Sequence, residues 1–247
     1  MSEPTPDPRL DAVLERLADE ASSEGPDGED ARLDALRAAV QADTGLGARL
    51  QSLSTPVRVG VLVAVVLLVA GAVAILNPRP DLALYPRLRL LFEAALPGVL
   101  ALVLGSVGLR GAHRPAPGRG MVLGLVLISV LVPVFSALAP PADMMLPGAK
   151  GQGAFGKEAL ACFLYGAAAA LPTGLVLRAL HRGPPPGPAR FALLGLGGAL
   201  AGVLALQLHC PIARPEHLML SHALIPVVAL VVVFLLTRGG ASRGRTK

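Results

Sequence analysis

The residues of this 247-residue chain best suited to chemistry are its two cysteines, Cys162 and Cys210. Three of its five histidines, His209, His217 and His222, lie beside the second cysteine or within twelve residues after it. Two thiols can form a disulfide, and two thiolates can bind a transition metal together with imidazole nitrogens. No other group of residues in the chain offers either chemistry.

Long apolar segments must position these side chains. Hydrophobic residues make up 53% of the chain and charged residues only 16%, whereas soluble domains carry about 25% charged residues. Six apolar runs approach or exceed the roughly 20 residues that cross a bilayer as a helix. We therefore expect an all-α membrane protein with six transmembrane helices. The predicted spans are 57–76, 90–109, 120–139, 157–180, 190–208 and 216–237.

The first 55 residues form a separate acidic segment that carries twelve of the seventeen acidic residues. Apolar residues recur there at helical spacing, which predicts two short amphipathic helices suited to a partner's groove. A disordered, solubilising tail is the alternative. The expected domains are the tail at 1–55, a transmembrane domain at 56–238 and a basic C-terminal tail at 239–247. The predicted partner-binding residues are Leu10, Val13, Leu14, Leu17, Leu33, Leu36 and Val40.

The distribution of lysine and arginine predicts the orientation. With the N-terminus inside, the inner segments hold twelve of these residues and the outer loops six, so the positive-inside rule places both termini in the cytoplasm. These basic residues lie in short loops at span ends. Their number therefore gives no reason to expect direct contact with nucleic acid.

This orientation places the thiols and the three neighbouring histidines in one outer layer. Cys162 follows Lys157 by five residues and lies about 8 Å into the fourth span at 1.5 Å per residue. A Cys162–Cys210 disulfide is one interpretation, and zinc bound by both thiolates and two histidines is another. His217 and His222 are expected about 140° apart on a helix, so one metal should not bind all five residues. Packing cysteines with hydrogen-bonded histidines are the third interpretation.

Small residues and missing motifs add further expectations. Gly198 and Gly202 in the fifth span, like Gly120 and Gly124 in the third, have the spacing that lets helices pack closely, although glycine is common throughout this chain. The chain has no HExxH, GxSxG or CxxC motif and no phosphate-binding loop of the GxxxxGK[S/T] type, so we do not expect an enzyme. No span has an ionisable residue clearly near its centre, which a transporter or proton pump usually needs.

Three segments carry a resemblance to a known family. They are Cys162-Phe-Leu-Tyr-Gly166, Ala205-Leu-Gln-Leu-His-Cys-Pro211 and His217-Leu-Met-Leu-Ser-His222. Their order resembles the NrsF-type six-span membrane anti-sigma factors of bacteria. Thr55-Pro-Val-Arg58, just before the first span, is similar to the membrane-entry motif of that family. The resemblance covers residues 55 to about 237, and the Leu-His-Cys-Pro corner is its most specific part.

The resemblance implies a function. Members of this family hold an extracytoplasmic-function sigma factor at the bacterial inner membrane through a cytoplasmic N-terminal segment, and a periplasmic cysteine pair takes part in releasing it in some members. Cys162 and Cys210 match that pair, so we expect a redox or metal sensor. The expected partners are a sigma factor and membrane lipid, and the only cofactor considered is zinc or another transition metal. The alternatives are a membrane metal-handling or transport protein that uses the Cys/His site, and a scaffold subunit without chemistry.

Overall fold

The computed structural model describes residues 50, 53–81, 83, 85–110, 117–138, 155–181, 187–212 and 214–243. Within these residues the regular secondary structure is all helical, joined by turns and loops, and contains no strand. Residues 1–49 of the predicted tail, which include the seven residues assigned to partner binding, lie outside them. Six of the helices are long and apolar enough to cross a membrane. The prediction of an all-α fold with six helices of spanning length and composition is therefore confirmed for the described residues. The architecture is that of a multi-pass membrane protein.

The helices begin and end within a few residues of the predicted spans. The sixth span is composite: a short helix, a π-helical turn and a long helix follow one another without a break. That last helix continues to Arg243, beyond the predicted limit of the transmembrane domain at residue 238. The elements are α4 (Thr55–Leu76), α5 (Arg87–Gly108), α6 (Arg119–Leu138), α7 (Phe155–Leu180), α8 (Pro188–His209), α9 (Pro215–Leu218), η1 (Met219–Ala223) and α10 (Leu224–Arg243).

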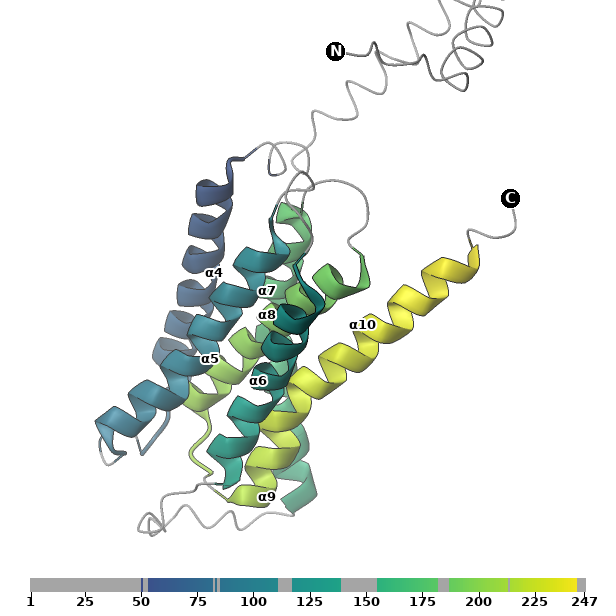
Figure 1. Ribbon diagram of the computed structural model, residues 1–247. Helices are drawn as coiled ribbons and strands as arrows, with labels where there is room; N and C mark the ends of the chain where they lie inside the picture. Colours follow the sequence, from purple (N-terminus) through teal and green to yellow (C-terminus); the bar gives the residue numbers. More distant parts are fainter. Residues whose placement is uncertain are drawn as a thin grey trace, which may run out of the picture. The chain divides into compact units, whose positions relative to one another are not determined.

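Helix α8 is the centre of the bundle. In its most apolar stretch 78% of the residues are buried, compared with 17–39% of the residues in the other spans. Helix α8 contacts α4, α5, α6, α7 and α10. Figure 1 shows α10, in yellow, inclined to the other helices and leaving the bundle along its second half. The outer helices expose large apolar side chains such as Leu68, Phe92 and Leu171, as helices bordered by lipid should.

Glycine lets α8 approach its neighbours closely, and the two predicted glycine motifs differ in this respect. A Cβ added to Gly198 would lie 3.1 Å from the Cα of Gly174, and one added to Gly202 would collide with the carbonyl oxygen of Gly166. Both contacts are with α7. Around Gly120 and Gly124 no atom lies within 4 Å of such a Cβ. The prediction of close packing was therefore correct for α8 and wrong for α6, whose glycines lie on an open face.

The π-helical turn η1 lies where the sequence weakens α-helical hydrogen bonding. Pro226 has no N–H to donate to the carbonyl of His222 four residues earlier, and its ring crowds that carbonyl. The Ser221 hydroxyl also donates to the carbonyl oxygen of His217 at 2.6 Å. A wider turn with i to i+5 spacing relieves both constraints, and it changes which side chains lie next to each other in the sixth span.

Candidate metal and redox site

The two cysteines come from different helices and meet at one end of the bundle. Cys162 lies in the second turn of α7 and is half-buried, whereas Cys210 follows the last residue of α8 and is 2% exposed. Their sulfur atoms are 3.7 Å apart, and both cysteines are free. The backbone N–H of Cys210 donates to the carbonyl oxygen of Leu206 at 2.7 Å. The fixed end of α8 therefore holds one thiol against a side chain of α7.

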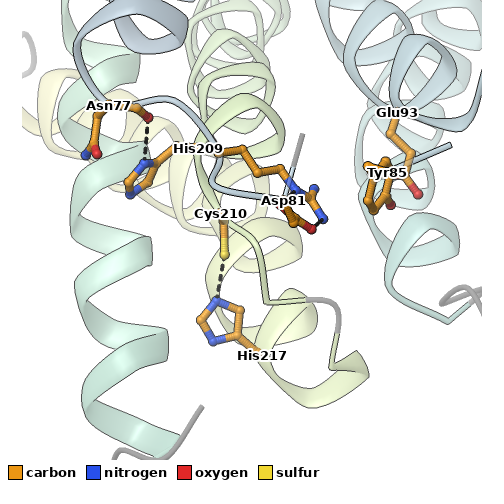
Figure 2. Close-up of polar contacts among 8 residues, drawn as sticks. Asn77, Asp81, Tyr85, Glu93, His209, Cys210 and His217 are labelled. Carbon is orange, nitrogen blue, oxygen red and sulfur yellow. Dashed lines mark hydrogen bonds and ion pairs between the residues drawn. The ribbon is translucent and has the colours of Figure 1, made fainter. Parts of the chain in front are cut away.

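His217 completes a three-residue cluster with the thiols. It lies in α9, is buried, and places its Nε2 atom 3.2 Å from Cys210 Sγ, a contact drawn in Figure 2. The ligand atoms of Cys162, Cys210 and His217 all lie within 4.8 Å of one another. The structure thus brings together three of the five residues that the sequence suggested as metal ligands.

His222 lies beside this cluster, which corrects the expectation that it points about 140° away from His217. The centroids of the two imidazole rings are 6.4 Å apart, in an edge-to-face arrangement. The expectation failed because the chain forms the π-helical turn η1 between them, so residues five apart lie about one turn apart. His222 is 1% exposed, and neither of its ring nitrogens has a hydrogen-bond partner among the residues that the structure describes. The signal in the sequence was Pro226, four residues after His222.

His209 is not part of the cluster. Because a carbonyl oxygen only accepts hydrogen bonds, the Nδ1 atom of His209 donates to the carbonyl oxygen of Asn77, at 3.1 Å, as Figure 2 shows. The His209 ring also packs on Tyr165, with centroids 4.4 Å apart. His209 therefore ties the end of α8 to the end of α4 and to α7, which is a structural role.

A neutralised charge network begins at the end of α8, where the backbone N–H of Arg79 donates to the carbonyl oxygen of Leu208 at 3.2 Å. The buried guanidinium of Arg79 donates to both carboxylate oxygens of Asp81, at 2.6 and 2.9 Å. The Tyr85 hydroxyl donates to Glu93 at 2.7 Å, and Figure 2 shows this pair. The hydrogen bond with Cys162, followed by burial, raises the pKa of the Cys210 thiol above its ordinary value. The thiol of Cys210 therefore gives up its proton less readily than an ordinary cysteine thiol does.

The geometry at the thiols allows two chemistries. A disulfide needs the sulfur atoms about 2.05 Å apart, which requires the side chains to approach by about 1.7 Å. A tetrahedral zinc ion with Zn–S distances of about 2.3 Å separates two thiolates by about 3.8 Å, close to the 3.7 Å found here. The same two sulfur atoms serve in both cases, so a bound metal and a disulfide exclude each other.

At the opposite end of the bundle, Arg58 forms a second buried polar centre that was not among the predicted site residues. Its guanidinium is 1% exposed and lies 3.4 Å from the carbonyl oxygens of both Leu109 and Leu180. These residues end α5 and α7, where helices leave carbonyl groups without partners and carry partial negative charge. The sequence had marked Arg58 only as part of the Thr55-Pro-Val-Arg58 segment at the entry to the first span.

We compared the chain with models of known families, with curated proteins and with solved structures. None of them matches.

Proposed function

We propose that this chain is a membrane-bound anti-sigma factor. Residues 1–55 hold an extracytoplasmic-function sigma factor on the cytoplasmic side of a bacterial inner membrane. A redox or metal signal at Cys162 and Cys210, on the periplasmic side, releases it. The chain acts as a regulator and not as an enzyme. Its resemblance to the NrsF-type family supplies the class of partner.

The observation that carries this proposal is the position of the thiols relative to the start of the membrane domain. Helix α4 begins beside Arg58, at the end of the bundle where α5 and α7 finish, and its other end meets His209. The thiols therefore lie across the bundle from the point where the N-terminal segment joins it. A sensor that reports an outside condition to a cytoplasmic tail needs this separation.

Helix α7 is a suitable connection between the two ends. It carries Cys162 in its second turn, and its last residue, Leu180, accepts a hydrogen bond from Arg58. A disulfide or metal that draws Cys162 towards the corner between α8 and α9 also moves α7 against Arg58. The two packings must differ in their affinity for the sigma factor, since a signal without differential affinity shifts no equilibrium.

The experiment is capture of a purified sigma factor by the full-length chain in detergent. The probe is the extracytoplasmic-function sigma factor encoded nearest to this chain's gene, with a housekeeping sigma factor as control. We expect reduced full-length chain to capture the first and not the second, and a chain that lacks residues 1–49 to capture neither. Equal capture by the truncated chain would overturn the proposal.

A metal-handling or transport protein is the second candidate, and the Cys162, Cys210 and His217 cluster is the observation that favours it. The charged side chains described on the spans lie towards the helix ends. Glu93 lies near the start of α5, where Arg89 neutralises its charge at 2.7 Å and the Tyr85 hydroxyl donates to it. Transport of the metal into vesicles, abolished by Cys210→Ser, would decide for this candidate.

A further inference from the structure

Two buried histidines lie beside the thiols. His217 and His222 are each 1% exposed. Within the described part of the chain, Nδ1 of His217 and both ring nitrogens of His222 have no hydrogen-bond partner. Burying polar nitrogen without a partner costs free energy. Imidazole nitrogens in such surroundings, next to two thiols, have the composition of a ligand set for a metal of intermediate softness.

We propose that Cys162, Cys210, His217 and His222 together bind one zinc ion as a closed four-coordinate site. The proposal rests on the proposed function, since it names the ligand that the sensor end of the bundle recognises. It excludes His209, whose Nδ1 donates to Asn77. The site joins α7, the end of α8 and the continuous α9–η1 segment, which belong to three different spans.

The distances between three of the ligands already match this assignment. Tetrahedral zinc with ordinary bond lengths places two thiolates about 3.8 Å apart, and a thiolate and an imidazole nitrogen about 3.5 Å apart. The corresponding distances are 3.7 Å for Cys162 to Cys210 and 3.2 Å for Cys210 to His217. Three ligands are therefore in place with little rearrangement.

The fourth ligand needs a small movement, which the π-helical turn permits. Two imidazoles on one tetrahedral zinc have ring centroids about 5.2 Å apart, whereas those of His217 and His222 are 6.4 Å apart. His222 must therefore move by about 1 Å towards His217. A regular α-helix would direct the two rings about 140° apart, so η1 is what makes His222 available. π-Helical turns frequently occur at functional sites for this reason.

Charge selects a divalent ion. Two thiolates and two neutral imidazoles carry a charge of −2, so Zn²⁺ gives a neutral site, whereas a monovalent ion such as Cu⁺ leaves a buried net charge of −1. A buried net charge without compensation is costly. Binding releases the two thiol protons to solvent and changes no oxidation state. Zinc also occupies both sulfur atoms, so the loaded site resists disulfide formation.

The test uses the full-length chain in detergent, reduced and then freed of reductant under anaerobic conditions. We expect one Zn²⁺ per chain, and Co²⁺ in its place should give the intense absorption of a tetrahedral thiolate complex. His222→Ala should weaken zinc binding by at least about tenfold, since even changes outside the ligand set cost that much. The matched control His209→Ala should leave zinc affinity within about twofold.

Three outcomes would overturn the site: no zinc bound by the wild-type chain, a cobalt complex without tetrahedral character, or His222→Ala binding zinc as the wild type does. Folding of His222→Ala is checked by its ability to form the Cys162–Cys210 disulfide with an added oxidant. A second readout uses only the wild type: zinc should protect both cysteines from maleimide, and equal labelling with and without zinc counts against the site.

The two proposals fail separately in these preparations. If zinc binds but the sigma factor is captured in no state, the zinc site stands and the anti-sigma function falls. If oxidation of the thiols releases a captured sigma factor while zinc does not bind, the zinc site falls and the anti-sigma function stands.

Discussion

The two ends of the bundle each contain buried polar groups, but these groups have different partners. At one end, Arg58 donates to carbonyl oxygens at the ends of α5 and α7. At the other end, two free thiols and His217 lie together beside His222, whose ring nitrogens have no partner in the described ranges of the chain. A cation placed on helix ends holds a structure together. Free thiols next to buried imidazoles leave ligand atoms available for an ion or an oxidant.

Burial alone does not distinguish a structural polar group from a reactive one. Arg58, His217 and His222 are equally buried, each at 1% exposure. These residues differ in their partners. The carbonyl groups beside Arg58 can only accept its hydrogen bonds, whereas the thiols beside the two histidines can lose protons and form new bonds. Changes at the two ends should therefore have separable effects, on stability at the Arg58 end and on chemistry at the thiol end.

The largest expected effect is loss of all thiol chemistry in Cys162→Ser or Cys210→Ser. Each removes one of the two sulfur atoms, which lie 3.7 Å apart, so neither the disulfide nor zinc binding can survive. The measurement is gel mobility under non-reducing conditions after a mild oxidant, together with zinc stoichiometry. An oxidant-dependent mobility shift of the monomer that persists in either variant would show that the wild-type shift does not report this disulfide.

The next largest effect is on stability, in Arg58→Ala. This change leaves the carbonyl groups of Leu109 and Leu180 without their charged donor, and we expect a loss of about 2–4 kcal/mol. The measurement is the midpoint of unfolding as SDS is added to a mild detergent. Arg87→Ala, at an exposed position, is the control and should change stability by less than about 0.5 kcal/mol. Folded Arg58→Ala should still bind one Zn²⁺ per chain, because Arg58 is not a ligand, and loss of this stoichiometry would contradict the assignment of the ligands to the thiol end.

Gly202→Ala tests the contact between α7 and α8 that lies between the two ends. Its added methyl group would collide with the carbonyl oxygen of Gly166, one turn from Cys162 on α7. We expect a loss of about 1–3 kcal/mol from overpacking, with slower disulfide formation. Gly124→Ala is the matched control, because nothing lies within 4 Å of its added methyl group. Equal stability of the two variants would contradict the close α7–α8 packing.

The smallest effect is expected for His209→Ala. This variant loses the hydrogen bond to Asn77 and the contact with Tyr165, which together contribute about 1–2 kcal/mol. Unfolding in detergent measures the loss, and cysteine reactivity measured with maleimide should change little. A strong change in zinc affinity in this variant would place His209 among the metal ligands. His209 could then no longer be distinguished, as a structural residue, from the metal-binding histidines.

The six helices could be predicted because length and apolar composition decide whether a segment can cross a membrane. The approach of Cys162 to Cys210 followed from topology, since an even number of crossings returns the chain to the same side. The π-helical turn could not be read from periodicity, because hydropathy patterns assume regular helices. Pro226 was the local sign that the assumption fails between His217 and His222.

Two other features depend on which helix face meets a neighbour, and spacing alone does not determine this. The glycine pairs at 120 and 124 and at 198 and 202 have the same spacing, yet only the second pair packs against another helix. Arg58 looked like an ordinary flanking charge of the first span. Its burial depends on the ends of α5 and α7, which are 51 and 122 residues away in the chain.

One measurement tests directly whether a change at the thiols alters sigma-factor binding at the other end of the bundle. The affinity of the full-length chain for the sigma factor encoded nearest to its gene is measured with the thiols reduced, oxidised to the disulfide and loaded with zinc, and then again in Cys162→Ser. We expect affinity to fall at least tenfold in the oxidised or the zinc-loaded wild type and to stay constant in the variant. Equal affinity in all three wild-type states would contradict a sensor that acts across the bundle.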